Sequence, residues 1–362
     1  MKHSIRHTIG LGIAMPATIY TTVSLAVVST YSENTYNRSV FNFLYDGGVY
    51  RYRIVGRQLV LLVAALLDRA GWHLNTSATL VAQAGSSWDL FDAFVVVNGV
   101  AFIGLSFMLF RFTVRDESWS TAYIILITLV GLSAYVVTPY DFLSYLFIVA
   151  AFIVAIAARP WSWPVCFVLA VLGTATRESF VIGVVALVGV VMARPGGIHH
   201  FRKAPQVNGG DPMLRAAISL ILGSIATYVF LRVALANPGD QGIFWNQSLL
   251  QLNMNMSSAV AVFIMATGSF ALLSALPARK VDADESGFDY QRATGYFWTL
   301  SIPYIAVTFI TGAWFEALRL VLPLLLGQYL IRYAFEHRLK ENAISTVDIP
   351  AGSKEELLPK TN

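Results

Sequence analysis

Long apolar stretches separated by short polar breaks dominate the chain from residue 9 to residue 334. A helix needs about 20 mainly apolar residues to cross the hydrocarbon core of a bilayer, so the pattern predicts an all-α, polytopic integral membrane protein with about ten transmembrane helices. The expected spans are residues 9–28, 90–110, 118–137, 142–158, 161–175, 179–193, 214–235, 257–277, 294–313 and 315–334.

One further apolar stretch, residues 58–67 (QLVLLVAALL), has only half the length of a crossing and is bounded by charged residues. Such a segment is typical of an interfacial or re-entrant helix. It lies within residues 31–89, which form a first outer loop far longer than a helix connection requires. Loops of this length in compact folds are usually functional or disordered.

The charges of the chain agree with this membrane arrangement. Hydrophobic residues make up 56% and charged residues only 13% of the sequence, against roughly 25% charged in an average soluble domain. The formal net charge is +4, and the basic residues are better explained by helix orientation and anionic headgroups than by nucleic acid. Nucleic acid is therefore excluded as a partner. The single cysteine, Cys166, excludes a disulfide framework and a cysteine zinc site.

The distribution of basic residues predicts the orientation. If residues 58–67 do not cross, 17 of the 25 basic residues, including every lysine, lie in cytoplasmic segments. This is the bias that the positive-inside rule expects, and it places both termini in the cytoplasm. Residues 194–215 then form a cytoplasmic loop. Residues 1–335 form one membrane domain, and residues 336–362 form a polar, disordered cytoplasmic tail.

The first outer loop contains an aromatic and arginine-rich stretch. Asp46 precedes two glycines, and Tyr50, Arg51 and Arg53 follow. Glycine lets the backbone turn sharply and approach a ligand, and arginine offers a planar fork that suits phosphate. The alternative is a turn whose aspartate caps the next helix, with arginines that contact lipid headgroups.

Three other outer breaks also carry ionisable residues. Asp141 follows a Thr-Pro-Tyr sequence, Arg177 and Glu178 lie side by side, and Glu316 and Arg319 are three residues apart. Charges at membrane depth are costly unless they pair or face a wet cavity, so these residues predict a shared pocket. Salt bridges that fix the helix ends are the alternative interpretation.

An acid, several arginines and an outer pocket suit transfer of a sugar from a polyprenyl-phosphate carrier to an acceptor. Arginines would bind the phosphate, and a carboxylate would take the proton of the acceptor hydroxyl. An activated lipid donor also explains the lack of a nucleotide-binding motif. A lipid-linked glycan polymerase or ligase needs similar residues. A secondary transporter would show two matched halves of the chain, each with Gly or Pro interruptions at the midplane, and the sequence lacks this symmetry. A non-catalytic scaffold is a further alternative, and it would tolerate the loss of these charges.

The first outer loop is long, carries an acidic residue followed by Tyr and Arg, and contains a predicted helix. The other outer breaks read Thr-Pro-Tyr-Asp, Thr-Arg-Glu-Ser and Glu-x-x-Arg. Together these features resemble the GT-C superfamily of membrane glycosyltransferases, in particular its uncharacterised bacterial relatives. The resemblance implies that Asp46 is the catalytic base. It also implies a polyprenyl-phosphate-linked sugar as donor and a glycan or lipid of the cell envelope as acceptor.

The resemblance favours a bacterial plasma (inner) membrane, where membrane lipids surround the protein. Many members carry a pair of acidic residues in the first loop, whereas glycines follow Asp46 here. No cofactor is therefore assigned, and a requirement for Mg²⁺ or Mn²⁺ stays open. Of the predicted site residues, Asp46 is assigned to catalysis. Those assigned to substrate binding are Tyr50, Arg51, Arg53, Asp141, Arg177, Glu178, Glu316 and Arg319.

Overall fold

The computed structural model describes most of the predicted membrane domain. The described residues are 5–26, 36, 38–46, 50–72, 90–114, 117–135, 138, 140–194, 211–235, 289–311 and 317–347, together with the isolated positions 260, 263, 267 and 268. Most of the predicted span at 257–277 lies outside them, as does Glu316.

The described part of the chain is all-α, as the sequence predicts. An α-helix coincides with each predicted span, apart from the one at 257–277. The elements are α1 (Ile5–Ile9), the π-helical segment η1 (Gly10–Ala14), α2 (Met15–Ala26), α4 (Arg38–Asp46), α5 (Ile54–Ala70), α6 (Phe91–Thr113), α7 (Glu117–Leu132), the 3-10 helix η4 (Ser133–Tyr135), α8 (Asp141–Ile156), α9 (Ser162–Thr176), the 3-10 helix η5 (Glu178–Phe180), α10 (Val181–Met192), α12 (Pro212–Ala234), α15 (Tyr290–Thr311) and α16 (Ala317–Val347).

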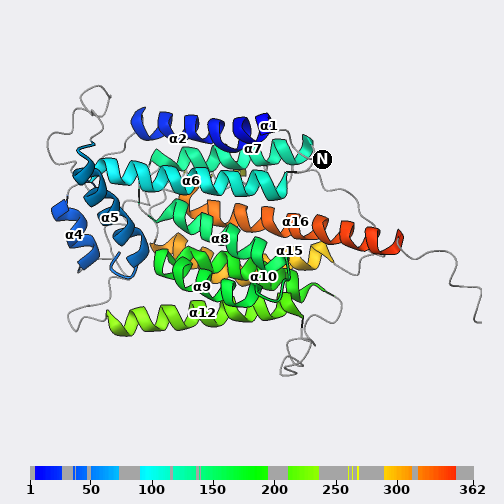
Figure 1. The fold of residues 1–362 in the computed structure, drawn as a ribbon. Coiled ribbons are helices and arrows are strands. Elements are labelled where there is room, and N and C mark those ends of the chain that lie inside the picture. Colours follow the sequence, from blue (N-terminus) through cyan, green and yellow to red (C-terminus); the bar gives the residue numbers. More distant parts are fainter. Residues whose placement is uncertain are drawn as a thin grey trace, which may run out of the picture.

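Three of these helices are long and apolar enough to cross a membrane, which indicates a membrane protein. They are Phe91–Thr113 in α6, Pro212–Ala234 in α12 and Leu318–Phe335 in α16. Shorter apolar helices occur at α7, α8, α9 and α10. All of them run roughly parallel to α2 and α15 in one bundle, with the N-terminus at one end and α4 and α5 at the other (Figure 1).

Close packing in the bundle depends on small residues. A side chain at Gly189 of α10 would come within 2.9 Å of the backbone oxygen of Ala293 in α15. A side chain at Gly223 of α12 would come within 2.8 Å of the methyl group of Ala170 in α9. Membrane helices often approach through such residues, because lipid supplies no hydrophobic force that would drive two helices together.

Helix α5 lies across the end of the bundle (Figure 1) and packs against α6 and α9. The short helix predicted at 58–67 is therefore present, and it extends further at both ends. Val60 and Ala64 are buried, whereas Leu62 and Leu66 are more than half exposed. Gly71 ends the helix in a left-handed conformation with φ 63°, which glycine adopts without strain. This helix thus has one packed face and one exposed apolar face.

The C-terminal boundary differs from the prediction. The sequence predicts a disordered tail from residue 336, but α16 continues to Val347. The residues after the apolar stretch include Glu, Leu, Lys and Ala, which are all strong helix formers, so loss of hydrophobicity does not end the helix. Residues 348–362 lie outside the described part of the chain.

The break between α9 and α10 depends on a glycine. Arg177 adopts an extended backbone with φ −164° and ψ 144°, which ends α9, and η5 then turns back toward that helix. The ring of Phe180 lies directly on Gly173, where a Cβ atom would be 2.2 Å from the ring carbon Cδ2. The absence of a side chain at Gly173 therefore lets the break adopt this shape.

We expect Gly173→Ala to lower the free energy of unfolding by about 1–3 kcal/mol, because Phe180 must move away from the new methyl group. Gly104→Ala in α6 is the matched control, since its nearest neighbour, Leu146, would lie 3.7 Å from the Cβ atom. Chemical unfolding in detergent micelles measures both variants. Equal stabilities for the two would contradict this account of the break.

Candidate functional site

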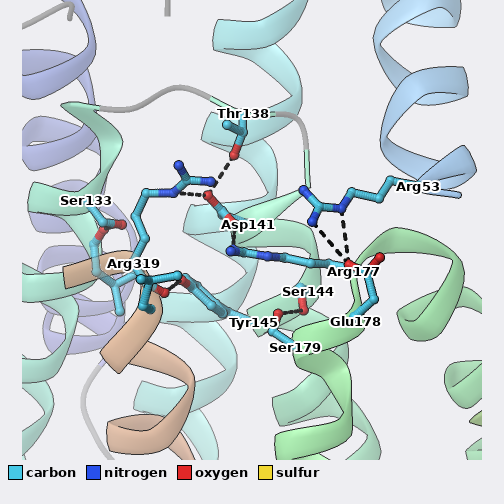
Figure 2. Close-up of polar contacts among 12 residues, drawn as sticks. Arg53, Ser133, Thr138, Asp141, Ser144, Tyr145, Arg177, Glu178, Ser179 and Arg319 are labelled. Carbon is cyan, nitrogen blue, oxygen red and sulfur yellow. Dashed lines mark hydrogen bonds and ion pairs between the residues drawn. The ribbon is translucent and has the colours of Figure 1, made fainter. Parts of the chain in front are cut away.

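Charged residues from separate helices meet at the end of the bundle where α5 lies. Asp141 is the first residue of α8, Arg319 is in the first turn of α16, and Arg177 directly follows α9. Figure 2 shows both arginine side chains directed at the Asp141 carboxylate. We call these three residues the Asp141 triad.

The contacts of the triad are short and buried. Arg319 Nε donates to Asp141 Oδ2 at 2.7 Å, and Arg177 Nη1 contacts Oδ1 of the same carboxylate. Thr138 Oγ1 also donates to Oδ2, at 2.7 Å. The side chains of the triad are 9% exposed or less. Because Asp141 neutralises only one positive charge, the triad keeps a net charge of +1.

Helix geometry explains the position of Asp141. A carboxylate is favoured at the N-terminus of a helix, whereas an arginine in the first turn of α16 faces the unfavourable end of that helix dipole. Burial lowers the pKa of Arg177 to about 10, and the charges of Arg319 and Arg53 act in the same direction. Asp141 supplies the counter-charge for both of these buried arginines.

A second group of charges surrounds Glu178, the first residue of η5. Arg53, just before α5, places Nε and Nη2 each 3.2 Å from Glu178 Oε2 (Figure 2). Arg232, near the end of α12, places Nη2 3.9 Å from Glu178 Oε1. We call these three residues the Glu178 group. Their side chains are 18–38% exposed, so this group is more open to solvent than the Asp141 triad.

Tyrosine rings hold the two arginines of the Glu178 group. The Arg53 guanidinium lies 4.3 Å from the ring centre of Tyr140 and 4.9 Å from that of Tyr50. Arg232 lies 3.9 Å from the ring centre of Tyr52 and 5.1 Å from that of Tyr228. Such cation–π contacts stabilise a positive charge without cancelling it.

Burial on its own would raise the pKa of Glu178. The charge of Arg53 and a hydrogen bond from the backbone amide of Glu178 outweigh this effect, so the pKa lies below its ordinary value. Glu178 is therefore an ionised carboxylate at neutral pH. The two groups together contain four arginines and two carboxylates, and this set is net positive.

The structure thus brings together five of the predicted site residues, namely Arg53, Asp141, Arg177, Glu178 and Arg319. Tyr50 adjoins them, since its ring centre lies 5.3 Å from that of Tyr140. Arg51 is buried, with its guanidinium 5.1 Å from the ring centre of Tyr52.

Asp46, the predicted catalytic base, has different partners. It ends α4, its side chain is 60% exposed, and Arg57 Nη2 lies 2.5 Å from its Oδ1. The neighbouring Tyr45 connects it to the site through a ring contact of 5.8 Å with Tyr50. Asp46 therefore lies beside the charged groups, and its carboxylate is accessible to solvent.

Sequence reasoning did not assign Arg232 or Tyr140 to the site. Arg232 lies at a predicted outer span end, which is a usable signal, but its distance in sequence from Glu178 conceals the contact. Tyr140 belongs to the Thr-Pro-Tyr-Asp break, and the centre of its ring lies 4.3 Å from the guanidinium of Arg53 and 5.4 Å from that of Arg177.

The described residues do not suit a divalent metal. Among them, no three His, Cys, Asp or Glu side chains lie close enough to hold a metal ion. Asp46, Asp141 and Glu178 each pair with arginine, and the positive charges around them disfavour a cation. An anion is the complementary ligand.

Comparison of the chain with protein-family models, with curated proteins and with solved structures finds no match in any of the three.

We expect Asp141→Asn to reduce the free energy of unfolding by about 3–5 kcal/mol, because it leaves two buried arginines without a counter-charge. Asp46→Asn should cost about 1 kcal/mol or less, since its pair with Arg57 is exposed. Chemical unfolding in micelles compares the two variants. If Asp141→Asn were no less stable than Asp46→Asn, the triad would not be a structural centre.

Proposed function

We propose that this chain is a GT-C-like glycosyltransferase that transfers a sugar from a polyprenyl-phosphate carrier to a glycan or lipid acceptor of the cell envelope. The proposal includes about ten membrane crossings, an outer face at the end where α5 lies, and cytoplasmic termini in a bacterial inner membrane. The observation that carries it is the net positive cluster of arginines and carboxylates at this end of the bundle.

Each feature of the cluster supports one requirement of the reaction. Arginine forks bind phosphate oxygens through charge-assisted hydrogen bonds, and they stabilise the phosphate as it leaves. The position at a bundle end suits a donor whose phosphate lies at the membrane surface and whose prenyl tail lies in lipid. The exposed apolar residues Leu62 and Leu66 on α5 suit the same interface.

The chemical step uses a carboxylate as the general base. The acceptor hydroxyl loses its proton to Asp46 while its oxygen forms a bond to the anomeric carbon of the sugar. The bond between that carbon and the phosphate oxygen breaks, and the polyprenyl phosphate leaves with the bonding electrons. Asp46 suits this role because its side chain is accessible to an acceptor.

A polymerase or ligase of lipid-linked glycans would use the same cluster and remains the second candidate. A secondary transporter is less well supported, because transporter sites typically lie near the bilayer midplane, whereas these charges lie at helix ends. The identity of the released lipid product distinguishes the first two functions.

We expect Arg53→Lys to lower the rate of sugar transfer about 10- to 100-fold, because lysine keeps the charge but loses the planar fork. Arg69→Lys is the matched control, since Arg69 is an exposed arginine in the last turn of α5, the helix that begins directly after Arg53. The assay follows labelled sugar from a panel of polyprenyl-phosphate donors into lipid and wall fractions. Wild-type transfer by Arg53→Lys would remove Arg53 from phosphate binding, and no transfer by the wild type from any donor would contradict the proposed function.

We also expect Asp46→Asn to lower transfer by about 10²- to 10⁴-fold, as loss of a general base does, while the variant still folds. Asp68→Asn, which removes an exposed carboxylate of α5, should keep wild-type transfer. The same donor assay measures both variants, with expression controlled in each membrane preparation. Full activity of Asp46→Asn would show that another group takes the proton.

A further inference from the structure

The two charged groups differ in how tightly their carboxylates are held. Asp141 accepts a hydrogen bond of 2.7 Å from Arg319 and contacts Arg177, in a setting that is nearly closed to solvent. Glu178 instead lies 3.2 Å from Arg53 and 3.9 Å from Arg232, and its side chain is 38% exposed. The Glu178 pairs are thus longer and more hydrated, and such pairs contribute little to stability.

The two arginines of the Glu178 group are fixed by contacts other than Glu178. Arg53 lies over the rings of Tyr50 and Tyr140, and Arg232 lies over that of Tyr52. Both guanidinium groups are therefore held in place if the carboxylate moves away. Preorganised donors of this kind favour binding, because little side-chain entropy is lost when a ligand arrives.

Arg232 also has hydrogen-bonding capacity to spare. Its Nε atom is buried and has no hydrogen-bond partner among the residues that the structure describes. Its contact with Glu178 is 3.9 Å long, which exceeds hydrogen-bonding distance. One carboxylate therefore faces two arginines and satisfies mainly Arg53. A phosphate has more acceptor oxygens and would serve both.

We propose that Arg53 and Arg232 form a subsite for a phosphate ester, and that Glu178 is the exchangeable counter-ion which the phosphate replaces. The proposal deepens the proposed function and rests on it in one respect only, namely that the phosphate ester is a lipid. Glu178 keeps the two arginines paired before the ligand binds, and it moves aside when the phosphate contacts both guanidinium groups. The Asp141 triad stays closed throughout and keeps the helix ends in position.

The sign of one mutational effect tests this proposal. Glu178→Gln removes the competing charge but keeps a side chain of the same shape, so it should bind farnesyl phosphate about three- to tenfold more tightly than the wild type. A structural role of Glu178 predicts no gain in affinity. Isothermal titration of the full-length protein in lipid nanodiscs measures the dissociation constants, and thermal unfolding confirms that the variant is folded.

Two further variants make the test specific. Arg232→Gln should weaken binding about tenfold, as the loss of a charged hydrogen bond does. Asp68→Asn is the matched control, because it removes an exposed carboxylate of α5 at the same end of the bundle and should leave the affinity unchanged. Equal or weaker binding by Glu178→Gln would overturn the proposal, and so would an equal gain in affinity by Asp68→Asn.

Inorganic phosphate serves as a second ligand. If Glu178→Gln strengthens binding of both ligands, the subsite recognises the phosphate group itself. If it strengthens binding of farnesyl phosphate alone, the subsite recognises the prenyl ester. Both results support the subsite. If Glu178→Gln binds neither ligand more tightly than the wild type does, the proposal is contradicted. The titration requires no catalysis, so a protein that binds phosphate but transfers no sugar would overturn the proposed function and leave the subsite intact.

Discussion

The carboxylate of Asp141 is the point on which the arrangement of helix ends depends. It forms ion pairs with arginines from two distant parts of the chain, Arg177 after α9 and Arg319 at the start of α16. Two buried guanidinium groups without a counter-charge would repel each other and lose their hydration, at a cost of several kcal/mol per ion. The contact therefore holds the ends of α8, α9 and α16 together without the hydrophobic force that acts between helices in water.

This fixed centre places the more open Glu178 group beside it. Arg177 and Glu178 are adjacent residues, so the same break that closes the triad also directs Glu178 toward Arg53 and Arg232. The break depends in turn on Gly173, which lets the ring of Phe180 pack directly against α9. The break between α9 and α10 thus contributes both to the buried Asp141 triad and to the more exposed Glu178 group. This difference in exposure is the basis of the proposed phosphate subsite.

The hydrophobic pattern predicted most of the helices, because a membrane requires long apolar segments whose ends are marked by polar breaks. It also identified residues 58–67 as a separate helix. The C-terminal boundary was less predictable, since helix propensity after residue 335 continues α16 where hydrophobicity ends. Among the charged residues that meet at this end of the bundle, clustering at predicted outer helix ends drew attention to Asp141, Arg177 and Arg319. Their pairing, and the contact between Arg232 and Glu178, depend on tertiary packing that no local pattern contains.

The central claim is that the arginines at this end of the bundle hold a phosphate ester while the Asp141 triad stays closed. An electron cryomicroscopy structure of the protein in nanodiscs with a bound polyprenyl phosphate tests it most directly. The account predicts phosphate density in contact with Arg53 and Arg232, with Glu178 displaced and both arginines of the triad still on Asp141. Phosphate density at the opposite end of the bundle, or within an opened triad, would contradict it.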